Sequence, residues 1–138
     1  MSTSLATHTR NAALSAIITD AGSTAYLWVW TGPPPAKVGT AFVAPTGTLL
    51  AKFQLANPIA PAPAAGVLTF NTIPIVTGLN TGTPQYYRIT STATDTDGST
   101  VVTQGSAGIN TGDLSFASLI AANGTVGISS FTYGEGNP

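Results

Sequence analysis

Apolar and polar residues follow two different periods along the chain. From Thr9 to Ala21 the apolar residues recur every three to four positions, which is the spacing of one face of an α-helix. Gly22 follows at a position where the end of a helix favours positive φ. The pattern predicts one amphipathic helix over residues 9–21, whose apolar face carries Ala13, Leu14, Ile17, Ile18 and Ala21.

Beyond Gly22 the chain is rich in Thr, Val, Ile and aromatic residues, and Gly, Pro and Asn interrupt it at regular intervals. This composition predicts seven or eight short strands. The first covers Ser23–Thr31, and both of its faces are apolar because Ala25, Leu27 and Val29 alternate with Tyr26, Trp28 and Trp30. We expect the N-terminal helix or a second subunit to cover the face that does not line the core.

The second well-defined strand is Thr48–Ala56, which alternates more regularly. Leu49, Ala51, Phe53 and Leu55 are expected to face the core, and Lys52 and Gln54 the solvent. The Asp95–Gly98 segment predicts a hairpin turn. The other expected strands are a weak one near Val38–Val43, Val67–Ile73, the hairpin pair Gln85–Ala93 and Thr100–Gln104, and a second hairpin pair Leu114–Ala121 and Thr125–Tyr133.

Two proline-rich segments separate these strands. Gly32 is followed by Pro33, Pro34 and Pro35, a run that prevents both a helix and a sheet ladder and therefore predicts a rigid extended loop. Residues 57–66 contain Pro58, Pro61 and Pro63 among Ala and Ile. This second segment is short and uncharged, so we expect it to lie against another surface rather than act as a linker.

Short strands joined by Gly- and Pro-rich turns are typical of an all-β sandwich or barrel, and about eight strands fit a jelly roll with one short N-terminal helix. The length of 138 residues fits a single β-sandwich domain over residues 1–138. The sequence has no internal repeat and no compositional boundary. It does not reveal the order of the strands.

Charge is scarce. Lys and Arg number four and Asp and Glu five, together 7% of the chain against roughly 25% in an average domain. The hydrophobic content of 43% still predicts a folded chain. The basic residues Arg10, Lys37, Lys52 and Arg88 are scattered, which argues against direct binding of nucleic acid. A nearly neutral surface suits a protein in a fixed assembly better than one that diffuses freely.

Cysteine is absent, so we expect neither disulfides nor thiolate metal sites, and synthesis in the cytoplasm is compatible with this composition. The N-terminal segment lacks a cationic stretch followed by an apolar core, so we expect no secretion signal. No apolar run approaches the ~20 residues that span a bilayer, and we expect no membrane partner.

Few residues are suited to catalysis. The single histidine, His8, is expected to be a solvated residue near the start of the helix rather than a general base. Asp95 and Asp97 could form a carboxylate pair or a calcium loop, but Gly98 follows directly and turn formation explains them better. Gly105–Gly108 lacks the Lys of a phosphate-binding loop. We therefore expect no enzyme activity, no cofactor and no metal.

The aromatic cluster is the one constellation that suggests binding. It comprises Tyr26, Trp28, Trp30, Tyr86 and Tyr87. Aromatic side chains on a sheet face can anchor a protein interface or stack a sugar, because they bury a large area at a small entropy cost. They can equally belong to the core. The sequence leaves these three interpretations open.

The opening segment MSTSLATHTRNAALSAIITDAGSTAYL and the ending FTYGEGNP resemble small virion proteins of tailed bacteriophages, as do the length and the charge-poor composition. Within that group the chain is most similar to cement, or decoration, proteins, which bind the outside of the capsid. The resemblance implies a jelly roll that dimerises and bridges neighbouring subunits of the major capsid protein. It supplies no motif from which a site could be transferred.

The resulting hypothesis is a structural virion protein, made in the cytoplasm of the bacterial host and located on the capsid surface. Its partners would be the major capsid protein and a second copy of itself. The outward aromatics and the Pro-rich loops would anchor the contact with the partner. The alternatives are a tail or fibre component and a carbohydrate-binding β-sandwich that uses Trp28 and Trp30. The predicted interface residues are Tyr26, Trp28, Trp30, Pro33, Pro34, Pro35, Pro58, Pro61 and Pro63.

Overall fold

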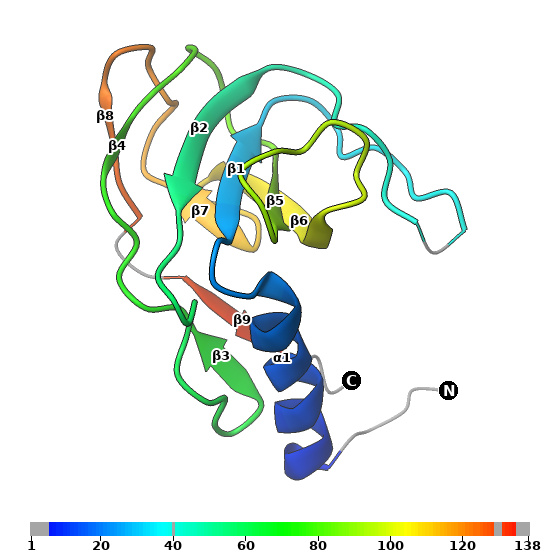
Figure 1. Cartoon of the computed structure of the whole chain (residues 1–138). Coiled ribbons are helices and arrows are strands. Elements are labelled where there is room, and N and C mark those ends of the chain that lie inside the picture. The colour runs from blue at the N-terminus through cyan, green and yellow to red at the C-terminus, as the bar shows by residue number, and fades with distance from the viewer. Residues whose placement is uncertain (1–5, 40, 129–130, 135–138) are drawn as a thin grey trace.

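The computed structural model describes residues 6–39, 41–128 and 131–134 and consists mainly of β-structure with one short helix (Figure 1). The elements are α1 (Thr7–Ala21), β1 (Tyr26–Trp30), β2 (Leu49–Gln54), β3 (Val67–Thr69), β4 (Val76–Thr77), β5 (Tyr86–Thr90), β6 (Val101–Ile109), β7 (Leu114–Phe116), β8 (Thr125–Val126) and β9 (Thr132–Gly134).

A curled five-stranded sheet forms the centre of the molecule, with the strand order β2-β1-β5-β6-β7. Its first four strands pair antiparallel, and β7 joins β6 in parallel. Two smaller pairs, β3-β9 and β4-β8, complete the described strands. The expected β-rich class with one helix is therefore confirmed. The expected two-sheet jelly roll is not.

The N-terminal helix is confirmed and is slightly longer than expected, since α1 begins at Thr7. Leu14 and Ala21 are buried, and Ile17 and Ile18 pack against the core from its edge. Ala13 is exposed, contrary to its predicted place on the apolar face. Gly22 ends the helix with φ 67°, and its N–H donates to the carbonyl of Ile18 at 3.2 Å.

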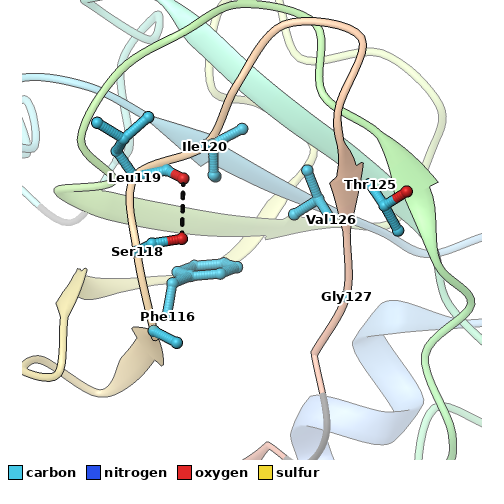
Figure 2. Close-up of a pocket in the computed structure, with 8 residues that line it drawn as sticks. Phe116, Ser118, Leu119, Ile120, Thr125, Val126 and Gly127 are labelled. Carbon is cyan, nitrogen blue, oxygen red and sulfur yellow. Dashed lines mark hydrogen bonds between the residues drawn. The ribbon is translucent and has the colours of Figure 1, made fainter.

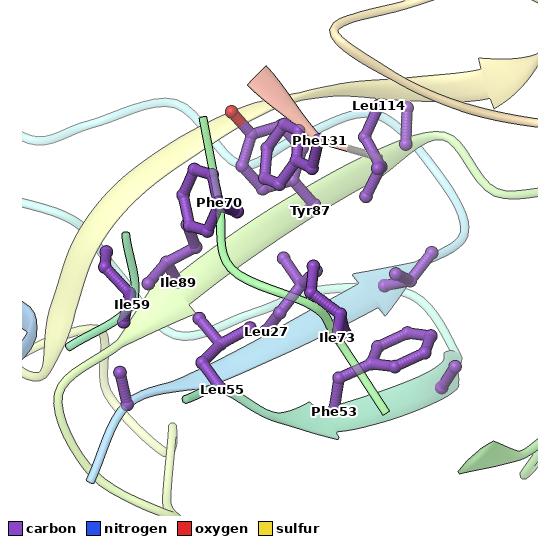
Figure 3. Packing of buried hydrophobic residues seen from close by; sticks show 14 of the residues in the cluster. Leu27, Phe53, Leu55, Ile59, Phe70, Ile73, Tyr87, Ile89, Leu114 and Phe131 are labelled. Carbon is purple, nitrogen blue, oxygen red and sulfur yellow. The ribbon is translucent and has the colours of Figure 1, made fainter. Parts of the chain in front are cut away.

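The core lies on the inner face of the five-stranded sheet, where β1 and β5 contribute Leu27, Val29, Tyr87 and Ile89. Figure 3 shows these strands with aromatic rings from the smaller pairs and connections packed over them. The Phe131 ring stacks on Phe70 with centroids 4.5 Å apart and meets Tyr87 edge-on at 5.2 Å. Burial of these rings joins the small strand pairs to the central sheet.

The alternation of β2 is interrupted once. Ala51, Phe53 and Leu55 face the core as expected, but Leu49 is only partly buried and Leu50 is fully buried. The register between β1 and β2 shifts at this point, because Val29 pairs with Ala51 and the next residue, Trp30, pairs with Leu49. The bulge adds one residue and turns Leu50 inward, so the expected side for Leu49 is wrong.

The structure corrects several other expected strands. The first hairpin, β5-β6, is confirmed, although its loop is longer than the Asp95–Gly98 turn alone. The second hairpin is wrong, because β7 pairs with β6 while β8 pairs with β4 and β9 with β3. Among the described residues of the expected strand Val38–Val43, Val38 and Ala41 form an isolated bridge, and the short β4 lies outside the strands that the sequence predicts. These elements are too short for a clear period.

The Pro-rich segment of residues 57–66 lies against the protein's own core. Ile59 and Ala60 are buried between its prolines, with 1% of each residue exposed. The carbonyls of Pro58 and Ile59 accept hydrogen bonds from Asn71, at 2.9 Å each. The expectation that this segment lies on another surface is thus confirmed, and that surface belongs to the same chain.

Candidate protein-interaction site

The outer face of the central sheet, opposite the core, presents an ordered array of side chains. The strand register aligns them in three rows, because residues of one pleat face the same side on neighbouring strands. In the order β2, β1, β5, β6, the rows are Gln54-Tyr26-Thr90-Val101, Lys52-Trp28-Arg88-Gln104 and Leu49-Trp30-Tyr86-Ser106.

Aromatic rings form a continuous stack across this face. Trp28 stacks on Trp30, and Trp30 on Tyr86, with centroids 6.5 and 6.3 Å apart. Tyr26 lies at 6.5 Å from Trp28 in a tilted arrangement. The ammonium group of Lys52 lies 4.8 Å from the Tyr26 centroid and 4.5 Å from that of Trp28, where it is attracted to the faces of both rings.

Arg88 occupies the middle of the array and is fully buried. Its Nη1 donates to both carboxylate oxygens of Asp95, at 3.2 and 3.1 Å. Nε donates to Gln104 at 2.9 Å, and Nη2 to the carbonyl of Val43 at 2.7 Å. Every nitrogen of the guanidinium therefore has an acceptor, which is the condition under which a charge can be buried.

These polar groups fix the long connection between β1 and β2, residues 32–47, which we call the arm. Figure 1 shows it extending away from the sheet, in cyan. Side chains of the outer face donate hydrogen bonds to three carbonyl groups of the arm: Gln104 to Pro35 at 3.2 Å, Arg88 to Val43 at 2.7 Å, and Tyr86 to Thr46 at 2.6 Å. The Tyr86 hydroxyl also accepts from the Thr46 N–H at 3.1 Å.

The β5–β6 loop, residues 91–100, covers the other side of the outer face. Asp95 reaches Arg88 from this loop, and the Ala93 carbonyl accepts a hydrogen bond from Lys52 at 2.8 Å. The loop also touches the arm: a Cβ added to Gly98 would lie 2.6 Å from the backbone carbonyl of Phe42. Arm and loop thus cover the outer face from two sides, in place of the helix or second subunit that the sequence led us to expect.

The far end of the arm forms its tip, of which the structure describes residues 36–39 and 41. The N–H of Val38 donates to the carbonyl of Ala41 and the N–H of Ala41 to that of Val38, both at 3.0 Å, which closes a narrow turn. Val38 is 71% exposed. The ammonium group of Lys37 lies 4.7 Å from the centroid of the Phe42 ring. The tip is an exposed, mostly apolar turn on a base that is fixed to the sheet.

The structure divides the predicted interface residues into two groups. Tyr26 and Trp30 are partly exposed, whereas Trp28 is only 7% exposed and donates from its indole nitrogen to the Thr90 hydroxyl at 2.8 Å. These three aromatic residues lie on β1, which leads into the arm.

The predicted proline residues lie in two places. In the arm, Pro33 and Pro34 are exposed and Pro35 is partly buried. In the segment of residues 57–66, Pro58 and Pro61 are exposed and Pro63 is partly buried.

The sequence interpretation missed the polar residues that hold the arm. The sequence alone indicates only scattered cations at Arg88 and Lys52, with Lys52 facing the solvent, and a turn residue at Asp95. It places Gln104 in a strand without a binding role. Asp97 does form the expected turn, since its carboxylate accepts from the Ser99 N–H at 2.9 Å. Hydrogen bonding with Ser99, first with its side chain and then with its backbone N–H, lowers the pKa of Asp97. The signal available in the sequence is an arginine between Tyr87 and Ile89 in an expected strand, where a charge is rare unless it is paired.

The remaining predictions concern His8, metal binding and membrane spans. His8 is exposed in the first turn of α1, so its predicted place near the helix start is confirmed. In the part of the chain that the structure describes, no three His, Asp or Glu side chains form a group that could hold a metal ion. Among the same residues, no helix is long and apolar enough to cross a bilayer.

A separate hollow of about 150 Å³ lies between the segment that follows β7 and strand β8 (Figure 2). Its lining is uncharged and consists of Phe116, Ala117, Ser118, Leu119, Ile120, Thr125, Val126 and Gly127. The Ser118 hydroxyl donates to the neighbouring carbonyl of Leu119 at 3.3 Å. The lining residues include no Asp, Glu, His, Lys, Arg or Tyr side chain.

Comparisons with known proteins give no identification: no protein-family model matches the chain, and the searches of curated proteins and of solved structures find no significant match. Any functional proposal therefore rests on the sequence and on the geometry described above.

Proposed function

We propose that this chain is a structural virion protein that binds the exterior of a tailed-phage capsid and bridges neighbouring subunits of the major capsid protein. The observation that carries the proposal is the arm, which is fixed to the sheet by buried polar groups and exposes its apolar tip. A segment that is already ordered loses little conformational entropy when it docks on a protein surface. The resemblance to cement proteins indicates which surface this would be.

The scarcity of free charge supports the same proposal. Two of the four basic side chains are engaged within the outer face, Arg88 with Asp95 and Lys52 with the Ala93 carbonyl. Contacts with a partner would therefore be mainly apolar and between peptide groups. In a shell each copy needs only an ordinary interface of ~1,600 Å², because the effect is repeated over many subunits.

The proposal includes three further points: the chain is related to jelly-roll proteins, it forms a homodimer through an isologous contact, and it is located on the capsid surface. Because arm and loop of the same chain cover the outer face around Trp28, the dimer contact would use another surface. Among the alternatives, sugar binding by Trp28 and Trp30 has less support, since stacking needs an open ring face and Trp28 is 7% exposed.

The decisive experiment mixes the purified protein with tailed-phage capsids that lack it, followed by co-sedimentation and imaging of the shells. We expect a regular array at fixed positions on the shell and an increased resistance of the shells to heat. A protein that binds isolated tails but not shells would favour the tail or fibre alternative. Binding on a glycan array without binding to shells would favour the sugar-binding alternative.

Self-association is tested separately by analytical ultracentrifugation at micromolar concentration. We expect a dimer or a larger species. A monomer at every concentration would contradict the proposed homodimer and leave capsid binding to be judged by the first experiment.

A further inference from the structure

The tip of the arm combines exposure with a defined shape. Ala36, Lys37, Val38 and Ala41 are all exposed, and two hydrogen bonds between Val38 and Ala41 hold the turn closed. Exposed apolar side chains on an ordered, projecting turn favour contact with another surface. The tip is therefore the part of the arm best placed to enter a recess.

The chemistry of the tip indicates the class of its partner. Lys37 is its one charged residue, and the ammonium group lies over the ring of Phe42. Nucleic acid binding requires several cations along a phosphate backbone. Burying a single valine side chain is too little for stable membrane anchoring. The tip also lacks an aromatic platform for a sugar, which leaves an uncharged recess on a protein surface as the best match.

The pose of the tip depends on groups that are not exposed themselves. Arg88 and Tyr86 are both fully buried, yet they bind the carbonyls of Val43 and Thr46, which lie in the part of the arm that returns from the tip to β2. Gln104 binds the carbonyl of Pro35 in the outgoing part. The two sides of the arm are thus tied to one face of the sheet, which limits the orientations that the tip can adopt.

We propose that the arm tip inserts through Val38 and its described neighbours, residues 36–39 and 41, as a preformed wedge into an apolar recess on a protein partner, and that Arg88 and Tyr86 are positioning residues that set the affinity without touching the partner. This inference rests on the proposed function, which identifies the partner as the major capsid protein. Its physical basis is preorganisation: loosening the arm increases the entropy lost on docking and so weakens binding.

The contact itself is tested with Val38→Asp, because a buried unpaired carboxylate in an apolar recess is strongly unfavourable. Ile75→Asp is the matched control, since Ile75 is 70% exposed and lies next to β4, outside the arm. We expect Val38→Asp to weaken capsid binding at least tenfold and Ile75→Asp to change it less than twofold. Equal effects of the two substitutions would overturn the assignment of the tip.

The positioning role is tested with Tyr86→Phe, which keeps the ring on Trp30 and removes only the hydroxyl bonded to Thr46. Thr69→Val is its control, because it removes an exposed hydroxyl of β3, outside the arm, for which no hydrogen bond is found among the described residues. We expect Tyr86→Phe to accelerate amide hydrogen exchange at Thr46 and to weaken capsid binding severalfold, and Thr69→Val to change neither. Faster exchange with unchanged affinity would overturn the positioning role, as would unchanged exchange.

The melting temperature of each free variant shows whether a loss of binding reflects unfolding, and only variants that stay folded under the assay conditions are compared. Wild-type protein that does not bind shells contradicts the proposed function, and the assigned partner of the tip with it. Wild-type protein that binds, with Val38→Asp binding equally well, contradicts the inference alone.

Discussion

At the scale of the residue, the buried ion pair of Arg88 and Asp95 is the most consequential feature of this protein. The outer face of a sheet would ordinarily be solvated, but here two loops cover it and exclude water from both side chains, which are 0% exposed. Gln104 and Val43 provide the remaining acceptors for Arg88. A buried pair of this kind contributes more to the specificity of the loop arrangement than to net stability.

Removing one partner of the pair leaves the other charge buried and uncompensated. We expect Arg88→Met to lower the free energy of unfolding by about 3–5 kcal/mol, measured by urea unfolding. The double variant Arg88→Met with Asp95→Leu should recover most of this loss, because neither charge remains. A single substitution that costs less than about 1 kcal/mol would show that the pair does not hold its loops in a dry environment.

The Tyr86 hydroxyl makes stability depend on alkaline pH. Burial raises the pKa of Tyr86 above its usual value of 10.0, although the hydrogen bonds with Thr46 and the nearby Arg88 oppose this effect. Above pH 10 the unfolded chain loses this proton while the folded chain keeps it, so the free energy of unfolding falls as pH rises. The contribution is complete below pH 10.

The measurement compares the wild type with Tyr86→Phe in urea unfolding from pH 8 to 11. We expect the stability of the wild type to fall more steeply above pH 10 than that of the variant, which lacks the phenol. Parallel curves would mean that the phenol ionises equally easily in the folded and the unfolded chain.

At the scale of the element, the arm and the β5–β6 loop depend on each other. Gly98 has φ 85°, a backbone conformation that residues with a Cβ rarely adopt. A methyl group at this position would also clash with the Phe42 carbonyl. The same loop carries Asp95 to Arg88, and the same arm carries the Val43 carbonyl. A change at the contact should therefore disturb both elements.

The glycines of these elements allow steric crowding to be separated from backbone strain. Gly32 has φ 83°, close to that of Gly98, but an added Cβ there meets nothing within 4 Å. We expect Gly32→Ala to cost about 1 kcal/mol from strain alone, and Gly98→Ala to cost clearly more and to accelerate amide exchange in the arm. Thermal unfolding and hydrogen exchange test this expectation, which equal costs for the two variants would contradict.

At the scale of the whole molecule, few charged side chains are present, and the fold and its loops are held by apolar contacts and buried polar groups. The exposed large apolar residues Val38, Ile75, Leu79 and Leu119 are distributed between the arm tip and the region of β4 and the hollow beside β8. Val38 at the arm tip is thus separated from Ile75, Leu79 and Leu119, which lie outside the arm.

Capsid binding should consequently be insensitive to salt. Surface ion pairs are screened within ~10 Å at 0.1 M salt and ~3 Å at 1 M, whereas apolar contacts are not. We expect the occupancy of shells to change less than twofold between these concentrations, measured by co-sedimentation. Loss of the protein from shells at 1 M salt would show that its few exposed charges carry the interaction, and would contradict an apolar tip contact.

Local patterns in the sequence are sufficient to predict the helix and the two faces of the first strand. The 3.6-residue period and Gly22 predict α1, and alternation correctly separates Leu27 and Val29 from Tyr26, Trp28 and Trp30 on opposite faces, because these patterns depend only on the geometry of helix and strand. Alternation does not say which of the two faces lines the core. The same local rules predict the β5-β6 hairpin and the stiffness of the Pro-rich segments.

The cover of the outer face and the pairing of the short strands depend on the folded chain as a whole. The period of a strand identifies its two faces but not what packs on each of them. From the sequence, Arg88 is therefore a scattered cation and Asp95 a turn residue, whereas in the folded chain their charged groups lie 3.1 Å apart. The short strands β7, β8 and β9 find partners far along the chain through burial of residues such as Phe131. Such pairing depends on the shape of the whole core, which no local pattern encodes.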